Sequence, residues 1–88
     1  MEAEFLEQFS KDLDSIHLKS VKNGLAKLIV RIELAQSLNE IPQTKKLKGH
    51  KSAFRVRIAD YRVGVFKEGN KIIFARIVHR KDIYTVFP

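Results

Sequence analysis

Several residue types that mark particular classes of protein are absent from this 88-residue chain or nearly so. There is no cysteine, which excludes disulfide bonds and thiolate metal ligands, and the three histidines are scattered, so we expect no metal centre. Two prolines and four glycines leave no room for a long linker. No apolar run approaches the length of roughly 18 residues that a membrane span requires. The start, MEAEFLEQF, is acidic, unlike a signal peptide, so we expect a cytoplasmic protein without a membrane partner.

The basic residues are unevenly distributed along the chain. The net charge is +7, and the stretch 45–88 carries twelve of the 17 Lys and Arg residues but only three of the ten acidic ones. This asymmetry indicates that an acidic partner, with nucleic acid as the first candidate, meets the second half of the chain. The length predicts one domain over residues 1–88.

The first helical pattern lies near the amino terminus. Phe9, Leu13 and Ile16 recur at spacings of four and three. They predict the buried face of a helix over residues 7–17. Residues 2–6, EAEFL, fit a brief edge strand that leads into this helix.

A second, longer helix is predicted from Ser20 to Asn39. Its apolar positions recur at helical spacing and are Val21, Leu25, Leu28, Ile29, Ile32 and Leu38. Ser20 is the expected N-cap, and Pro42 stops the helix. Gly24 costs about 1 kcal/mol relative to alanine. It indicates either close packing on a neighbouring element or a break in the helix.

The second half of the chain predicts three strands. Residues 53–59, AFRVRIA, and 61–67, YRVGVFK, alternate between apolar and other side chains. Residues 71–78, KIIFARIV, are apolar at nearly every position, which is typical of an interior strand. Asp60 and residues 68–70 supply turns. We therefore expect an α+β fold in which two N-terminal helices pack on one face of a small, mainly antiparallel sheet of three to four strands.

Five arginines are predicted on the opposite face of this sheet. If Ile73, Ala75 and Ile77 face the helices, alternation sends the arginines of that strand to the other side. The predicted set is Arg55, Arg57, Arg62, Arg76 and Arg80, with Lys45, Lys46, Lys48 and Lys51 in the preceding segment. One arginine on a solvated face needs no ligand, but five repel one another unless an anion offsets the charge. Guanidinium suits phosphate because its planar fork donates bidentate hydrogen bonds.

Four short motifs occur in an order that resembles the RelE branch of the RelE/ParE toxin superfamily. They follow the two helices and are K-L-K-G at 46–49, F-R-V-R-I at 54–58, D-Y-R at 60–62 and H-R-K-D-I-Y at 79–84. The resemblance covers nearly the whole chain. It implies a RelE-like toxin of a type II toxin-antitoxin pair that cleaves messenger RNA in the A site of the 70S ribosome, without metal or other cofactor. It also implies a cognate antitoxin wrapped around the toxin in a hetero-oligomer.

The resemblance implies roles for individual residues. Arg55 and Arg57 stand where such toxins often have a basic pair. Arg62 matches the arginine of D-Y-R, Arg80 matches the arginine near the end of the last strand, and Tyr84 matches a tyrosine that orients or stacks on the substrate. The implied reaction is attack of an RNA 2′-hydroxyl on the adjacent phosphorus, with Arg57, Arg62 and Arg80 stabilising the phosphorane. The residues expected to hold RNA phosphates are Lys46, Lys48, Lys51, Arg55, Arg76 and Lys81.

The general acid and base stay open. Some relatives have lysines where this chain has Arg55 and Arg57, and guanidinium is a poor proton shuttle because its pKa exceeds about 12. His79 titrates near neutrality, but its parity points toward the helices, so a packed, hydrogen-bonded histidine competes with a catalytic one. Tyr84 is either an acid or stacking platform, or an anchor for residues 85–88.

Two other functions fit the sequence. One is a ParE-like inhibitor of DNA gyrase that carries out no chemistry of its own, and the other is a non-catalytic basic domain that binds an acidic partner peptide. The joint presence of Arg62, Arg80 and Tyr84 favours the RelE pattern over both. His50 is expected at the surface of a basic loop, and Asp60 as a turn residue rather than a base.

Overall fold

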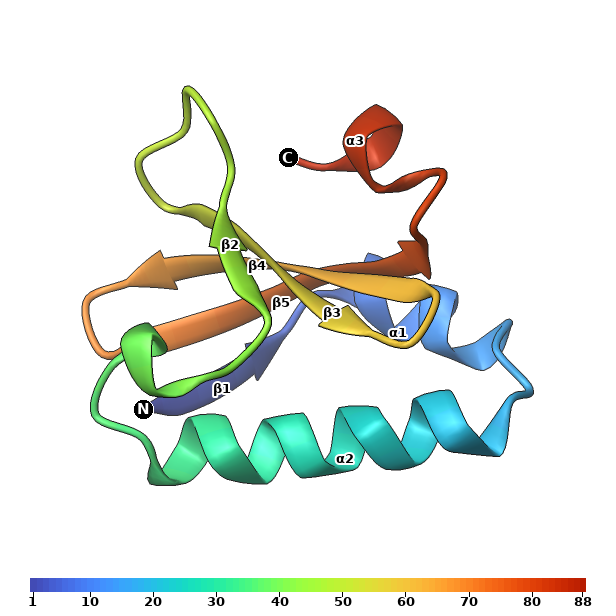
Figure 1. The fold of residues 1–88 in the computed structure, drawn as a ribbon, viewed down its shortest axis with the longest axis horizontal. Helices are drawn as coiled ribbons and strands as arrows, with labels where there is room; N and C mark the ends of the chain where they lie inside the picture. The colour runs from blue at the N-terminus through green and yellow to red at the C-terminus, as the bar shows by residue number, and fades with distance from the viewer.

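The computed structural model describes all 88 residues and confirms the predicted α+β arrangement. In chain order its elements are β1 (Glu2–Phe5), α1 (Glu7–Asp14), α2 (Lys19–Leu34), the 3-10 turn η1 (Leu38–Glu40), β2 (Thr44–Lys46), β3 (Ala53–Ile58), β4 (Tyr61–Glu68), β5 (Lys71–His79) and α3 (Ile83–Val86). The strands form one sheet in the order β1-β5-β4-β3-β2. α1 and α2 cover one face of this sheet, and α3 lies over the other (Figure 1). None of the helices has the length and apolar character of a membrane span.

Two short strands border the sheet. β1 pairs in parallel with β5, which confirms the predicted edge strand. β2 pairs antiparallel with β3, with Lys45 opposite Arg55, and is a fifth strand beyond the three or four expected. β3, β4 and β5 form an antiparallel meander whose hairpin turns contain Asp60 and Gly69, as predicted.

The main hydrophobic core lies between the two N-terminal helices and the sheet. Its buried members are Phe9, Ile16, Val21, Leu25, Leu28, Ile32, Ala35, Leu38, Ile41, Val56, Val63, Val65, Ile72, Phe74 and Ile77. The ring centroid of Phe74 lies 5.0 Å from that of Phe5 and 5.4 Å from that of Phe9. These aromatic contacts fasten β1 and α1 to the interior strand β5.

The helix ends differ from the periodicity-based prediction. α1 ends at Asp14 rather than near His17, because the next two backbone amides bond to carbonyl groups three residues back in a tight turn. The prediction of Ser20 as N-cap is wrong, since Leu18 holds that position without a side-chain hydrogen bond. α2 stops before Leu38, which reaches the core from η1.

Gly24 allows α2 to approach β3 closely. A Cβ atom at this position would lie 2.7 Å from Cγ2 of Ile58. α2 continues through Gly24 without a break. The close packing predicted for this glycine is therefore confirmed.

A β-bulge interrupts β5 and changes the alternation predicted for that strand. The pairing with β4 skips Ala75, which has no cross-strand partner. Phe74 and Ile77 both reach the main core, whereas Ala75 packs on the opposite face. The prediction that Ile73, Ala75 and Ile77 share the helix-covered face is therefore wrong for Ile73 and Ala75, because the inserted residue shifts the register by one.

A second, smaller cluster of buried side chains covers part of the face that the helices leave open. Its members are Leu47, Ala53, Ala75, Ile83 and Phe87. Phe87 lies directly over Gly64, where a Cβ atom would come within 2.7 Å of its ring, and its ring centroid is 4.9 Å from that of Phe66. The amide of Phe87 donates to the carbonyl oxygen of Ile83 at 2.8 Å. This cluster holds α3 against the sheet.

Candidate functional site

Four arginines gather on the sheet face that α1 and α2 leave open. We call Arg55, Arg57, Arg62 and Arg80 the arginine face. Val56 points into the main core, so the alternation of β3 sends Arg55 and Arg57 to the opposite side, as predicted. Arg62 on β4 stands directly opposite Arg57 on β3. Arg80 follows β5, and its backbone amide donates to the carbonyl oxygen of Asp60 at 2.7 Å.

The arginine face concentrates positive charge without an internal counter-ion. The three ion pairs of the chain are Lys11–Glu7, Lys71–Glu4 and Arg76–Asp12, and none involves these four arginines. Burial lowers the pKa of Arg62, and the charges of Arg55, Arg57 and Arg80 lower it further. Like charges directly opposite on neighbouring strands are destabilising. An anion bound here would relieve this repulsion.

Hydrogen bonds to the backbone hold the Arg62 guanidinium in place. Its Nη1 donates to the carbonyl oxygens of Ala59 and Tyr61 at 3.1 and 3.0 Å. The side chain is half-buried between its arginine neighbours. Arg62 is thus the most fixed member of the arginine face, and its remaining N–H groups are available to a ligand.

Tyr84 stands on α3 beside the arginine face. Its hydroxyl oxygen accepts a hydrogen bond from Nε of Arg55 at 3.1 Å, and 64% of the residue is exposed. Ile83 and Phe87, which are 0% and 4% exposed, anchor the tail on either side of it. The interpretation of Tyr84 as an anchor is therefore wrong. The i, i+4 spacing of Ile83 and Phe87 was the available signal for the true anchors.

Arg76 does not join the arginine face, contrary to the predicted parity. Its Nε and Nη2 donate to the carboxylate of Asp12 on α1 at 2.7 and 3.1 Å. The same carboxylate accepts the backbone amide of Ile77 at 3.1 Å. Burial raises the pKa of Asp12, but hydrogen bonds from Arg76, Gln8 and Ile77 outweigh burial and leave the pKa below its ordinary value. The bulge turns Arg76 toward α1, where its charge is neutralised.

His79 lies at the end of β5, on the side toward the helices, as its parity predicts. Its ring packs edge-on against Tyr61 with 5.7 Å between the centroids, and Tyr61 packs on the main core. Its Nδ1 accepts the backbone amide of Lys81 at 3.2 Å. These contacts are those of a packed, hydrogen-bonded histidine and leave it away from the arginine face.

The lysines predicted to hold phosphate divide between the two faces. Lys45, opposite Arg55, extends the arginine face, although it was not among the predicted site residues. Lys46 stands opposite Phe54 on the helix side, contrary to the expectation for a phosphate-binding residue. The remaining lysines and the loop histidine, all exposed outside the sheet, are Lys48, His50, Lys51 and Lys81.

The arrangement can stabilise negative charge but offers few proton carriers. Arg55 and Arg57 offer guanidinium groups, which donate hydrogen bonds but are poor proton shuttles. The Tyr84 hydroxyl is the one group at the arginine face that can both donate and accept a hydrogen bond while neutral. No group of three or more His, Cys, Asp or Glu side chains is brought together anywhere in the chain.

Comparison with known proteins identifies clear relatives. Residues 3–84 match the family model described as ParE toxin of the type II toxin-antitoxin system, parDE. Toxin RelE3 of Methanocaldococcus jannaschii is 35% identical over 89 residues, covering 100% of both chains. The crystal structure of the RelB-RelE antitoxin-toxin complex from Methanococcus jannaschii contains a chain that matches with a TM-score of 0.83 and 34% identity, over 97% of this chain and 99% of that one. YafQ of E. coli shares the fold, with a TM-score of 0.71 at 20% identity over 91% and 93% of the chains.

Proposed function

Because this chain belongs to the RelE/ParE superfamily of toxins from type II toxin-antitoxin systems, we propose that it is an endoribonuclease that cleaves messenger RNA on the ribosome. The observation that carries the proposal is the arginine face with Tyr84 at its border. It groups four unpaired guanidinium groups around a fixed Arg62. Because ribosomes are in the cytoplasm, we expect the protein to act there.

The proposed reaction needs no covalent enzyme intermediate. The 2′-oxygen of a nucleotide attacks the phosphorus of its own 3′-phosphodiester, and the bond from phosphorus to the 5′-oxygen of the next nucleotide breaks. The 2′-hydroxyl proton leaves to a base, and the departing 5′-oxygen takes up a proton. The products are a 2′,3′-cyclic phosphate and a 5′-hydroxyl.

The arginine face supplies the electrostatic part of this reaction. Arg57, Arg62 and Arg80 donate to the phosphorane oxygens, which carry more negative charge than the ground-state phosphate. Burial and, after it, the charges of the neighbouring arginines lower the pKa of Arg62, and the repulsion among these arginines is relieved most by the species with the most negative charge. The Nε of Arg55 donates a hydrogen bond to the hydroxyl of Tyr84. The ring of Tyr84 stacks on a base, or its hydroxyl donates a proton to the leaving oxygen.

A cognate antitoxin is the proposed protein partner. The RelB-RelE complex from Methanococcus jannaschii is an antitoxin-toxin complex, and its matching chain is 34% identical to this one. An antitoxin that binds this chain would form a toxin-antitoxin hetero-oligomer and hold the toxin inactive. The other proposed partners are messenger RNA and the ribosomal A site.

Primer extension on a translated message tests the proposal. Purified chain and ribosomes should create new 5′ ends within codons, and Arg80→Ala or Tyr84→Ala should abolish them. Lys22→Ala is the matched control, because Lys22 is exposed on α2, away from the arginine face. A message that stays intact while translation continues unaffected would refute the proposal.

A ParE-like inhibitor of DNA gyrase is the second candidate function. The observation that favours it is the family model, whose description names a ParE toxin. A supercoiling assay with purified gyrase separates the two candidates. Inhibition of supercoiling with intact message would establish the gyrase inhibitor, and cleavage with unaffected supercoiling would establish the nuclease.

A further inference from the structure

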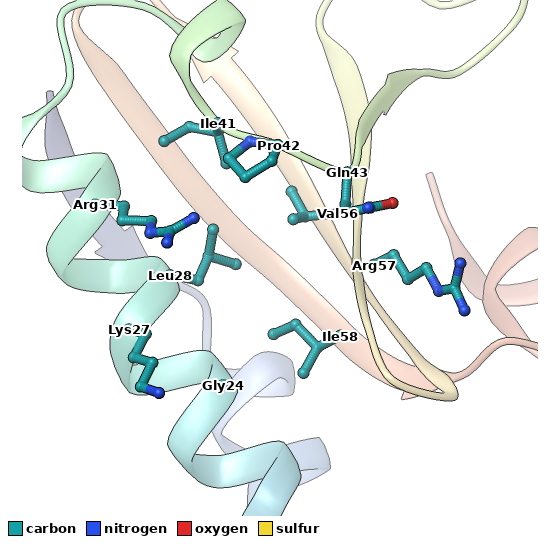
Figure 2. Close-up of a pocket in the computed structure, with 10 residues that line it drawn as sticks. All are labelled: Gly24, Lys27, Leu28, Arg31, Ile41, Pro42, Gln43, Val56, Arg57 and Ile58. Atoms are coloured by element: carbon teal, nitrogen blue, oxygen red, sulfur yellow. The ribbon is translucent and has the colours of Figure 1, made fainter.

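A single inserted residue decides on which face of the sheet Arg80 lies. In a regular strand successive side chains point to opposite faces, as Figure 2 shows for β3, where Arg57 points away from α2 and Ile58 points toward it. Phe74 of β5 lies in the main core, and Arg80 follows six positions later. Uninterrupted alternation would therefore send Arg80 to the face that the helices cover. Arg80 joins the arginine face because Ala75, which has no partner on β4, shifts the alternation by one residue.

The strand beyond the bulge leads directly to Arg80. Ile77 returns to the main core, and His79 stands opposite Tyr61 on β4. The pairing continues one step past the end of β5, because the backbone amide of Arg80 donates to the carbonyl oxygen of Asp60 at 2.7 Å. A displacement of β5 beyond the bulge would therefore carry Arg80 with it.

Asp12 fastens the bulge to α1. Its carboxylate accepts Nε and Nη2 of Arg76 at 2.7 and 3.1 Å, and it also accepts the backbone amide of Ile77 at 3.1 Å. The two residues that follow the inserted Ala75 are thus bonded to one side chain. The side chains of Asp12 and Arg76 are only 8% and 23% exposed, so solvent screens this ion pair little. Nε2 of Gln8 donates a further hydrogen bond to the carboxylate at 3.1 Å.

Two ion pairs join an N-terminal element to β5, and they lie on opposite sides of the bulge. Glu4 of β1 pairs with Lys71 at 3.6 Å, where both side chains are about half exposed. β1 pairs with β5 only as far as Phe74. Beyond that point Asp12 takes the place of a neighbouring strand, because it accepts the amide of Ile77. The pair of Asp12 is therefore the one that reaches the part of β5 that leads to Arg80.

We infer that Asp12 is a positioning residue for Arg80: by holding Arg76 and Ile77 it fixes the bulge, and with it the face and the place that Arg80 takes. Without the carboxylate, the half-buried guanidinium of Arg76 is left unpaired, and β5 beyond the bulge shifts to bring that charge to water. The inference rests on the proposed nuclease for its kinetic test alone. Because Arg80 is proposed to contact the phosphorane, its displacement should lower kcat and leave KM unchanged.

Single-site kinetics on ribosome-bound message separate positioning from stability. Asp12→Asn should lower kcat by about tenfold or more, at a temperature where the chain is folded. Leu28→Ala is the control for stability, because it removes a buried side chain of α2 that lies beside Val56 of β3. Glu4→Gln is the control for loss of an ion pair on β5. Both controls should keep the kcat of the wild type.

A second substitution tests whether Asp12 acts through Arg80. In an Arg80→Lys chain, which has already lost the planar fork, Asp12→Asn should lower kcat by about twofold or less. The same factor as in the wild-type chain would overturn the inference. If Asp12→Asn does not fold, Arg76→Gln replaces it, because its amide can still donate to Asp12 while the charge is gone; kcat should again fall, and an unchanged kcat would overturn the inference.

Amide hydrogen exchange gives a readout that needs no RNA. In Asp12→Asn the amides of Ile77 and Arg80 should exchange about tenfold faster or more, relative to those of residues 72–74 upstream of the bulge. Leu28→Ala should speed exchange in both groups by one common factor. Equal acceleration of the two groups in Asp12→Asn would overturn the inference. A wild-type chain that does not cleave RNA would refute the proposed nuclease, and the exchange rates would then decide the role of Asp12 alone.

Discussion

Replacing Phe87 with alanine should release α3 from the sheet while the rest of the chain stays folded. Phe87 and Ile83 are the two large side chains through which the tail enters the smaller cluster. Between them stands Tyr84, whose side chain makes no buried contact of its own. Release of the tail therefore removes Tyr84 from the arginine face without touching an arginine.

The size of the effect follows from the burial of these two anchors. Burial of two large apolar side chains contributes about 3 to 6 kcal/mol. The conformational freedom that the tail loses when it docks offsets most of this gain, since fixing the backbone of one residue costs about 1 kcal/mol. The free energy of docking the tail is therefore small, and loss of Phe87 shifts the equilibrium toward the released tail. The free energy of unfolding should fall by less than about 2 kcal/mol, rather than the roughly 3 to 5 kcal/mol that Phe→Ala costs in a rigid core.

The assay uses the tyrosine content of the chain. With no tryptophan and two tyrosines, Tyr61→Phe leaves Tyr84 as the only intrinsic fluorophore of this type. In that background Phe87→Ala should lower the fluorescence anisotropy of Tyr84 and reduce RNA cleavage by at least about 10- to 100-fold, the loss expected when the ring no longer stacks on a base. Val86→Ala, in the same short helix but outside the cluster, is the control. Unchanged anisotropy together with a stability loss of 3 kcal/mol or more, on the scale of a rigid core, would refute the reasoning.

Three further outcomes are expected. Folding lowers the pKa of Asp12, so its carboxylate stabilises the fold fully above its unfolded-state pKa of about 3.9, and this contribution is lost as the pH falls through the lower folded value. Asp12→Asn should lower the free energy of unfolding by about 3 kcal/mol at pH 7. In urea denaturation it should also weaken the decrease of that free energy at acidic pH. Arg57→Gln should stabilise the fold by about 0.2 to 1 kcal/mol at low salt, because it removes the repulsion with Arg62, and it should reduce RNA cleavage. A variant that is no more stable than the wild type in low-salt thermal melts would contradict this. Gly24→Ala should destabilise despite the gain in helix propensity, by about 1 to 3 kcal/mol, and Ile58→Ala in the same chain should recover part of the loss in urea denaturation.

Strand alternation was enough to predict most of the arginine face. Arg55 and Arg57 alternate with buried residues in a regular strand, so their side of the sheet follows from period two alone. Arg62 follows from the same rule across the hairpin. These strands contain no insertion before those positions, and the prediction holds.

Arg76 was misplaced because its strand carries a bulge that the pattern conceals. Residues 71–78 are apolar at nearly every position, so a shift of one residue leaves no trace in the hydropathy. The carboxylate that accepts the hydrogen bonds of Arg76 belongs to Asp12 on α1, 64 positions away. Pairing at that separation follows from tertiary packing rather than from local periodicity.

The tail was the other element that the pattern did not reveal. Residues 83–87 offer one i, i+4 apolar pair, Ile83 and Phe87, which is too little to predict a helix by itself. Their burial depends on Gly64, which leaves an open patch on β4 for the ring of Phe87. The glycine and the ring it accommodates lie far apart in the chain, so neither signals the other.

Single-turnover cleavage of ribosome-bound message by matched arginine variants is the most direct test of the arginine face as the reaction centre. Arg62 and Arg31 are both free of ion pairs, but Arg62 lies in the arginine face and Arg31 lies on α2, in a hollow between this helix and β3. Arg62→Ala should slow cleavage by about 100-fold or more and Arg31→Ala should leave the rate unchanged, with 2′,3′-cyclic phosphate and 5′-hydroxyl ends from the wild type. Equal effects of the two substitutions, or products with other end groups, would contradict the account.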